Sequence, residues 1–357
     1  MKLVSVVGNR PQFVKAAPLS RALRRRGREV LVHTGQHYDP QLADLFFDEL
    51  GVPPPDHALG VGPGTPTEQT AAILLRLEGL LGVERPDLVL VYGDTTTTLA
   101  GALAAAKLGL PVAHVEAGMR SFDRSMPEEQ NRVVTDHLSS LLFCPTDVAV
   151  ANLAAEGVVR GVHQVGDVMY DASRLFAPAA RARPGPRALG LEPGAYLLVT
   201  VHRAAATDTQ PALEALVALL ESLEEPAVFP VHPRTRNRLL EAGLWGRLAA
   251  HPSLRLSEPL GYLDFTALLI GARALLTDSG GAQKEAYFHG IPCLTLRDTT
   301  EWVETVEGGY NRLVGMDADR ARAALADLRM PDERPALYGD GHAAERIADA
   351  VLAFVRS

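Results

Sequence analysis

Short apolar runs alternate with amphipathic stretches along the whole chain of 357 residues. The apolar runs have the length and composition of buried strands, and the stretches between them repeat their apolar residues with the period of a helix. This alternation predicts an α/β fold in which helices cover parallel sheets. Strands are predicted at residues 3–7, 29–33, 88–92, 112–115, 141–144, 162–165, 196–201, 227–231, 254–256, 274–277 and 292–296, and clear helices at 11–26, 39–50 and 342–356.

One stretch interrupts this pattern near the middle of the chain, at residues 177–187. It consists largely of Pro, Ala, Arg and Gly, so we predict no regular structure there and a domain boundary just before it. The strand–helix pattern then restarts. We predict two domains that face each other across a cleft: residues 1–167, completed by a C-terminal helix at 343–357, and residues 168–342. One large sheet is the alternative, and the interruption argues against it.

The charge and the cysteine content exclude several kinds of partner. The charge of 35 − 43 = −8 argues against nucleic acid or an anionic membrane as the main partner. Cys144 and Cys293 lie in separate apolar runs, so we predict neither a disulfide nor a thiolate metal site. No apolar stretch reaches the roughly 18 residues needed to span a bilayer, and no signal peptide precedes the first strand. We therefore predict a cytoplasmic protein.

The apolar run at 112–115 ends directly on an acid, Glu116. A buried strand that ends on an unpaired carboxylate loses hydration free energy, but in open α/β sheets the carboxyl ends of the strands are where ligands bind. A helix that begins a short loop later carries Glu128 and Arg132. Glu116 is therefore a candidate for the chemistry. The alternative is that Glu116 pairs with Arg120 and only fixes the loop.

A second acid, Asp94, follows the neighbouring predicted strand at 88–92. Acids clustered in a cleft raise one another's pKa, as general acid–base catalysis requires. Two structural alternatives remain open: Asp94 could cap the following helix, and Glu128 with Arg132 could form an ordinary pair four residues apart.

Basic residues follow the first strand, where Arg10 and Lys15 lie near the start of a predicted helix. Two cations at a helix N-terminus could bind a diphosphate, and a solvated basic patch is the alternative. The segment is not a dinucleotide fingerprint, because it lacks the pattern of three glycines.

The second half presents ionisable groups in the same way. His202 and Arg203 follow one predicted strand, and His232 follows the next. The run from Asp278 through Ser279, Gly280 and Gly281 to Glu285 is the clearest binding signal. Its small residues would let backbone N–H groups reach a phosphate, and the carboxylate of Glu285 could accept the ribose hydroxyls. Histidines with a purely structural role and a glycine turn that packs a helix on a strand are the alternatives.

Together these motifs resemble the non-hydrolysing UDP-N-acetylglucosamine 2-epimerases, and they do so in both halves of the chain. The resemblance is carried by Gly8-Asn9-Arg10-Pro11, Gly93-Asp94-Thr95, His114-Val115-Glu116-Ala117-Gly118, Pro127-Glu128-Glu129, His202-Arg203, Asp278-Ser279-Gly280-Gly281 and Arg297-Asp298-Thr299-Thr300-Glu301. No single one of these motifs would suffice.

The resemblance implies two Rossmann-like domains of the GT-B structural class, with parallel sheets facing a central cleft. It also implies inversion of C2 of a UDP-sugar without a cofactor or metal, through elimination of UDP to 2-acetamidoglucal and its re-addition, in a homodimer that serves surface polysaccharide synthesis. The acid–base candidates would be Asp94, Glu116, Glu128 and His202, supported by Lys15 and Arg132. The substrate-binding residues would be Arg10, Lys15, Asp94, Glu116, His202, Arg203, His232, Leu260, Phe265, Ser279, Gly280, Gly281 and Glu285.

Two departures from the family pattern bear on the sugar. Trp302 stands where many members have an arginine that contacts the nucleotide sugar, and the opening motif has Asn9 and Gln12 where Thr and Glu are common. Both changes resemble a sub-branch that includes epimerases of UDP-2,3-diacetamido-glucuronate. Gln36-His37 matches part of an allosteric UDP-GlcNAc site of some members, but its flanking residues do not. A GT-B glycosyltransferase and a non-catalytic nucleotide-sugar sensor are the competing functions.

Overall fold

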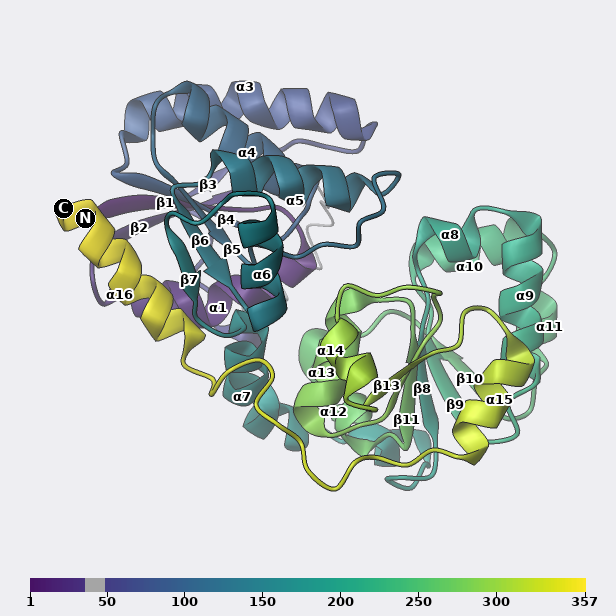
Figure 1. Ribbon diagram of the computed structural model, residues 1–357. Coiled ribbons are helices and arrows are strands. Elements are labelled where there is room, and N and C mark those ends of the chain that lie inside the picture. The colour runs from purple at the N-terminus through teal and green to yellow at the C-terminus, as the bar shows by residue number, and fades with distance from the viewer. Residues whose placement is uncertain (36–48) are drawn as a thin grey trace. The chain divides into compact units, whose positions relative to one another are not determined.

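The structure is a computed structural model that describes residues 1–35 and 49–357. The chain forms two compact units (Figure 1). Unit 1 comprises Met1–Leu175 and Ala336–Ser357, and unit 2 comprises Phe176–Pro335. The chain passes from one unit to the other within a helix, after the predicted domain boundary at residue 167.

Unit 1 is built on a parallel sheet of seven strands in the order β3-β2-β1-β4-β5-β6-β7. The strand order reverses at β1 and β4, the place where open α/β sheets bind ligands. The strands are β1 (Lys2–Val7), β2 (Arg28–His33), β3 (His57–Ala58), β4 (Leu88–Tyr92), β5 (Val112–Val115), β6 (Leu141–Cys144) and β7 (Val162–Gln164).

Helices cover both faces of this sheet, with α3, α4 and α5 on one face and α1 and α16 on the other (Figure 1). Apolar side chains of α3 and α4 pack on valines of β1, β2 and β4, and each fully buried aliphatic side chain contributes about 1.5–3 kcal/mol. The helices are α1 (Arg10–Arg24), α3 (Pro66–Glu84), α4 (Thr96–Lys107), α5 (Pro127–Leu138), α6 (Asp147–Ala155), α7 (Val168–Arg181) and α16 (Ala343–Arg356).

The closing helix α16 is tied to unit 1 at its start and near its middle. Asp171 of α7 accepts hydrogen bonds from the backbone N–H groups of Ala343 (3.1 Å) and Ala344 (2.7 Å), and so satisfies donors that the first turn of a helix leaves open. Further along, Arg26 pairs with Asp349 at 2.7 Å. The last helix therefore completes the fold of the first unit.

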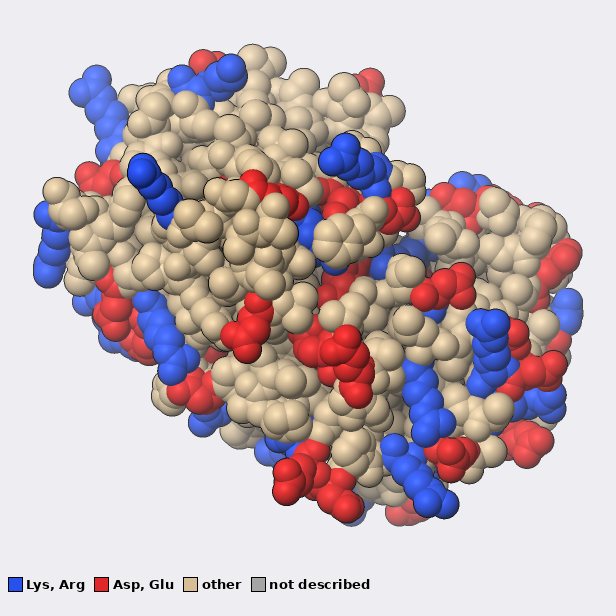
Figure 2. Space-filling view, viewed as in Figure 1, with Lys and Arg blue, Asp and Glu red and all other residues tan. Residues whose placement is uncertain are grey.

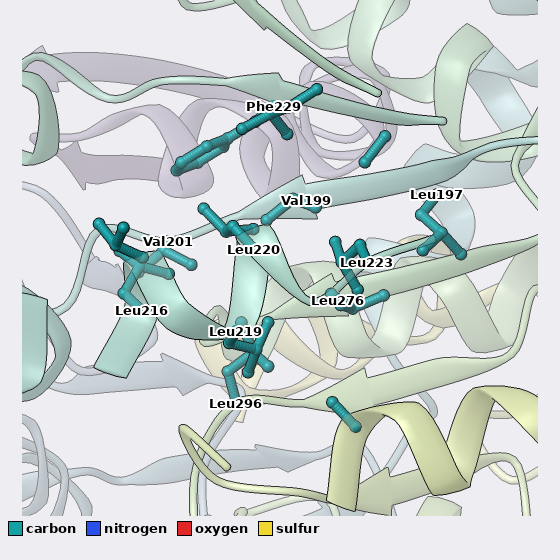
Figure 3. Packing of buried hydrophobic residues seen from close by; sticks show 14 of the residues in the cluster. Leu197, Val199, Val201, Leu216, Leu219, Leu220, Leu223, Phe229, Leu276 and Leu296 are labelled. Carbon is teal, nitrogen blue, oxygen red and sulfur yellow. The ribbon is translucent and has the colours of Figure 1, made fainter. Parts of the chain in front are cut away.

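Unit 2 repeats the same topology in a parallel sheet of six strands, in the order β10-β9-β8-β11-β12-β13. Leu197, Val199 and Val201 lie against leucines of α9 in its largest core cluster (Figure 3). The strands are β8 (Leu197–Thr200), β9 (Ala227–Pro230), β10 (Leu254–Ser257), β11 (Ala274–Thr277), β12 (Cys293–Thr295) and β13 (Asn311–Leu313).

The helices of unit 2 also lie on both faces of their sheet, with α9, α11 and α15 on one face and α12 and α13 on the other (Figure 1). They are α8 (Ala204–Thr207), α9 (Gln210–Glu221), α10 (Pro233–Glu241), α11 (Trp245–Ala249), α12 (Tyr262–Gly271), α13 (Gly280–His289), α14 (Val303–Glu307) and α15 (Ala318–Ala326), with a 3₁₀ helix at Gly185–Leu189. Two parallel, helix-covered sheets confirm the predicted α/β fold class.

The prediction of an irregular stretch at 177–187 is wrong. Helix α7 runs to Arg181 with Pro178 inside it, and the 3₁₀ helix follows at Gly185–Leu189. Proline costs the helix one hydrogen bond, but alanine and arginine favour helix, and buried Phe176, Ala177 and Ala180 give it an apolar face. The predicted strands omit short β3 and β13. Most of the helix predicted at 39–50, and Gln36-His37, lie outside the described residues.

Among the described residues, no helix is both long and apolar enough to cross a membrane. On the face shown in Figure 2, described basic side chains alternate with acidic ones rather than gathering in one basic area.

Candidate active site

In unit 1, Glu116 forms an ion pair with Lys15. Glu116 follows β5 directly, and Lys15 lies in α1, which follows β1 of the same sheet. Glu116 has a positive φ of 72°, a left-handed conformation that costs a non-glycine residue about 1–3 kcal/mol. The alternative pairing with Arg120 is wrong, because Arg120 binds Asp136 and Glu156 instead.

Asp94 forms the second ion pair at the carboxyl end of this sheet. Its Oδ2 lies 2.5 Å from Nη2 of Arg132, and its backbone carbonyl accepts a hydrogen bond from the Asn131 side chain at 2.9 Å. Thr95, not Asp94, caps α4. The capping alternative is therefore wrong, and Asp94, about a third exposed (36%), remains accessible for chemistry.

Helix α5 supplies the third acid of this region. Arg132 of this helix extends to Asp94 and to Glu129 (3.2 Å). Glu129 in turn accepts hydrogen bonds from the backbone N–H groups of Ser121 (2.8 Å) and Phe122 (3.0 Å). Glu128 lies half-buried in the first turn of the same helix.

The start of α1 is fixed by Gln12, which the sequence indicated only as a departure from the family's opening motif. Gln12 is buried, accepts a hydrogen bond from Gly8 N at 2.7 Å, and donates to the carbonyl of Tyr92 at 2.8 Å. Gln12 therefore links the C-terminal ends of β1 and β4. Lys15 lies in α1, which follows β1, and Asp94 follows β4. Arg10 lies half-buried in the first turn of α1.

In unit 2, Asp278 gathers the residues that follow β8. Its Oδ2 accepts hydrogen bonds from the backbone N–H groups of His202 (2.9 Å) and Arg203 (2.7 Å), and its Oδ1 lies 3.5 Å from Nδ1 of His202. The ring of His202 also lies next to that of exposed His232, with the ring centres 5.7 Å apart and the planes tilted by 37°. Asp278 thus sets the orientation of the predicted acid–base histidine.

Next to Asp278, α13 begins with a capped turn of small residues. Ser279 caps the helix through a hydrogen bond from Ala282 N (3.4 Å), and Gly280 and Gly281 form its first turn. A Cβ atom on Gly280 would lie 3.2 Å from Nε1 of Trp302, so the turn leaves little room there. Glu285 is buried about one turn further along. Backbone N–H groups and the helix dipole make this turn suitable for a phosphate.

Two predicted binding residues pack beneath this helix. Leu260 and Phe265 are partly buried against a core cluster that includes Leu198 and Ala282. Their place next to α13 is compatible with a contact to a nucleobase, and that contact stays a prediction.

A buried lysine lies under Trp302. Nζ of Lys284 lies 4.0 Å from the centre of the indole ring, and the two residues are only 1% and 4% exposed. A cation over an indole face is stabilised by the ring quadrupole. Close by, Arg297 and Glu301 form a two-fold ion pair (3.0 and 3.1 Å). Lysine is scarce in this sequence, but nothing in the sequence indicated this contact.

Comparisons with known proteins identify the family of the chain. A family model described as UDP-N-acetylglucosamine 2-epimerase matches residues 21–352. The chain belongs to this family. It is therefore a member of a family of isomerases, and the resemblance noted from its motifs is confirmed.

Relatives of this chain match it over nearly their whole length. A UDP-N-acetylglucosamine 2-epimerase homolog of Methanococcus maripaludis is 46% identical, with 98% of this chain and 99% of the relative covered. The UDP-2,3-diacetamido-2,3-dideoxy-D-glucuronate 2-epimerase of Pseudomonas aeruginosa is 45% identical over 98% and 99%. The crystal structure of Methanocaldococcus jannaschii UDP-GlcNAc 2-epimerase in complex with UDP-GlcNAc and UDP is 41% identical, with a TM-score of 0.92 over 99% and 100%.

Proposed function

We propose that the protein is a non-hydrolysing epimerase that interconverts UDP-GlcNAc and UDP-ManNAc. The observation that carries this proposal is the pair of carboxylates, Asp94 and Glu116, held by cations at the ends of two adjacent strands of unit 1. The names of relatives, and the crystal structure of one relative with UDP-GlcNAc and UDP, support a UDP-sugar as the substrate.

The first step would be elimination of UDP. The C2 proton of the sugar has no adjacent carbonyl to acidify it, so direct abstraction would face a high barrier. As the C1–O bond breaks, its electron pair leaves with UDP and C1 gains oxocarbenium character. A carboxylate then removes the C2 proton, and the C2–H electron pair becomes the C1–C2 double bond of 2-acetamidoglucal.

The second step would reverse the first with the opposite stereochemistry. An oxygen of UDP adds to C1, and an acid delivers a proton to the other face of C2. We assign these acid–base roles to Asp94, Glu116, Glu128 and His202, with Lys15 and Arg132 orienting the carboxylates.

The leaving group needs stabilisation of its negative charge. Arg10, Arg203 and the N-terminus of α13 would supply it, because preorganised cations and N–H donors stabilise charge that develops in the transition state. Glu285 would accept the ribose hydroxyls. His232, Leu260 and Phe265 would complete the UDP site.

Incubation with UDP-GlcNAc in deuterated water, followed by NMR, tests this function. We expect UDP-ManNAc to form and both epimers to carry deuterium at C2. Product without deuterium would refute the elimination mechanism. Release of UDP only in the presence of an added acceptor sugar would show a glycosyltransferase instead.

Trp302 favours a second candidate, an epimerase of UDP-2,3-diacetamido-2,3-dideoxy-glucuronate. This indole takes the place of an arginine, is buried, and covers Lys284 next to Gly280. A 45% identical relative bears the name of that activity.

Turnover of the two nucleotide sugars, measured side by side, separates the candidates. No activity on UDP-GlcNAc together with turnover of the diacetamido-glucuronate would establish the second. In that case Trp302→Arg should lower kcat/KM for the diacetamido sugar about tenfold, because an added cation next to Lys284 unstacks the buried pair. Val303→Arg, at an exposed neighbour, is the matched control.

We also propose that the protein acts as a homodimer in the cytoplasm and supplies surface polysaccharide synthesis, as its family resemblance implies. Light scattering of the purified protein tests the dimer. A monomer at working concentration would contradict it.

A further inference from the structure

A fully buried histidine connects the two strand ends that carry Asp94 and Glu116. His114 lies in β5, and its Nε2 is 2.7 Å from the carbonyl oxygen of Gly93. Its Nδ1 is 2.7 Å from Oδ1 of Asp136 in α5. Both ring nitrogens are therefore in short hydrogen bonds away from water.

The partners of His114 determine which ring nitrogens carry protons. A carbonyl oxygen can only accept, so Nε2 must be the donor in the bond to Gly93. Asp136 accepts through its other oxygen from Gly118 N (3.1 Å) and from Nη1 of Arg120 (2.7 Å). A carboxylate with this many donors is ionised, and then Nδ1 must donate as well.

The charges around the ring of His114 agree with a second cation there, in addition to Arg120. Asp136 and Glu156 share Arg120, and His137 reaches only the outer carboxylate of Glu156 (3.0 Å) at the surface. Burial raises the pKa of Asp136, but the charges and hydrogen bonds of His114 and Arg120 outweigh it and hold this pKa below its usual range. Near Asp136, burial raises the pKa of the Cys144 thiol to about 12, so this thiol is neutral.

The same cluster holds the backbone just before Asp94 and just after Glu116, the two catalytic candidates. The carbonyl that binds His114 belongs to Gly93, which has a positive φ of 63° and precedes Asp94. The N–H that binds Asp136 belongs to Gly118, just beyond Glu116. Glu116 itself has a positive φ of 72°. Backbone in such conformations persists only where its surroundings hold it.

We propose that His114 is a buried imidazolium, protonated at both ring nitrogens, and that it is a positioning residue for Asp94 and Glu116. With Asp136 it fixes the peptide groups from which both carboxylates extend. The kinetic part of this proposal rests on the proposed epimerase activity, whereas the protonation part does not.

NMR of the full chain, labelled with ¹⁵N at its 11 histidines, tests the protonation state directly. We expect both ring nitrogens of His114 to carry a directly bonded proton at neutral pH, and the loss of its signals in His114→Gln to identify them. A ring nitrogen of His114 without a proton at neutral pH would overturn the proposal. The protonation state itself is read in the unaltered protein.

Asp136→Asn tests the positioning role. We expect one ring proton of His114 to be lost and kcat to fall about 10- to 100-fold, the usual cost of removing a supporting hydrogen bond to a functional group, while KM changes less than about threefold. Glu156→Gln, which alters the outer partner of Arg120, is the matched control and should retain both ring protons and kcat within about threefold.

The outcomes separate the two proposals. A folded Asp136→Asn variant with unchanged kcat would overturn the positioning role. If the unaltered protein shows no epimerase activity, the proposed function fails while the protonation result still stands.

Discussion

The two units share one topology but carry different chemistry at the same edge of their sheets. In unit 1 the strand ends bear acids locked to cations, as in Glu116 with Lys15 and Asp94 with Arg132. In unit 2 the corresponding ends bear Asp278, which mainly binds backbone N–H groups, and the glycine turn that opens α13. The same strand order therefore presents acids paired with cations in one unit, and backbone N–H groups and a glycine turn in the other.

This difference follows from what each task needs. A group that moves a proton must be a titratable side chain at a fixed position, and paired charges provide both. A diphosphate needs converging donors without bulk, and small residues at a helix N-terminus provide those. Variants that lower turnover without changing UDP affinity, or lower UDP affinity alone, test this difference between the two units.

The largest effect should follow from Asp94→Asn. Loss of the carboxylate that pairs with Arg132 should lower kcat about 100- to 10,000-fold, the range for an acid–base group, with UDP affinity unchanged within about threefold. Asp87, which precedes the same strand and accepts a hydrogen bond from Lys2 N at 2.7 Å, offers the matched control. Steady-state kinetics and calorimetry with UDP provide the two readouts. Equal losses in Asp94→Asn and Asp87→Asn would contradict the assignment.

The next effect is on the stability of unit 1. Asp136→Asn removes one partner of a buried ion pair and should lower the free energy of unfolding by about 3–5 kcal/mol at neutral pH. Because the folded pKa of Asp136 is lowered, its contribution is present above the unfolded pKa of about 3.9 and is lost as pH falls through the folded value.

Below about pH 4, the difference in unfolding free energy between the unaltered protein and Asp136→Asn should therefore shrink as the pH falls. Denaturant unfolding across this acid range measures it. A difference that instead grows as the pH falls below about 4 would show that Asp136 is protonated in the folded state.

The smallest effect concerns unit 2. Gly280→Ala places a Cβ atom 3.2 Å from Nε1 of Trp302 and should weaken UDP binding about tenfold through crowding of the turn. Gly246→Ala in the first turn of α11 is the control, because its Cβ meets nothing within 4 Å. Calorimetry with UDP compares them. Unchanged affinity in Gly280→Ala would argue against a close approach of UDP to this turn.

The sheets could be predicted from the sequence because their strands are continuous apolar runs buried on both faces. Leu88–Tyr92 is fully buried along its whole length, and its pattern has no competing interpretation. The short strands β3 and β13 have no such run. The helical segment around Pro178 was hidden by residues that usually end helices, because its stability comes from tertiary packing.

The sequence indicated where the candidate site lies, but not which of its residues contact one another. Strand ends indicate where Asp94 and Glu116 lie, whereas their partners come from distant helices and depend on strand order. His114 reads as one more residue of an apolar strand, and only the position of α5 reveals Asp136 beside it. The stack of Lys284 on Trp302 likewise depends on how a loop returns to α13.

The rate at which UDP-GlcNAc gains deuterium at C2 tests the central claim most directly. It should be measured at saturating substrate in the unaltered protein, in Glu116→Gln and in Glu84→Gln, where Glu84 forms another lysine–glutamate pair of unit 1, with Lys2 at 2.7 Å. We predict that exchange falls at least about 100-fold in Glu116→Gln and is unchanged in Glu84→Gln. Exchange at the unaltered rate in Glu116→Gln would contradict the claim that the acids at these strand ends move the C2 proton.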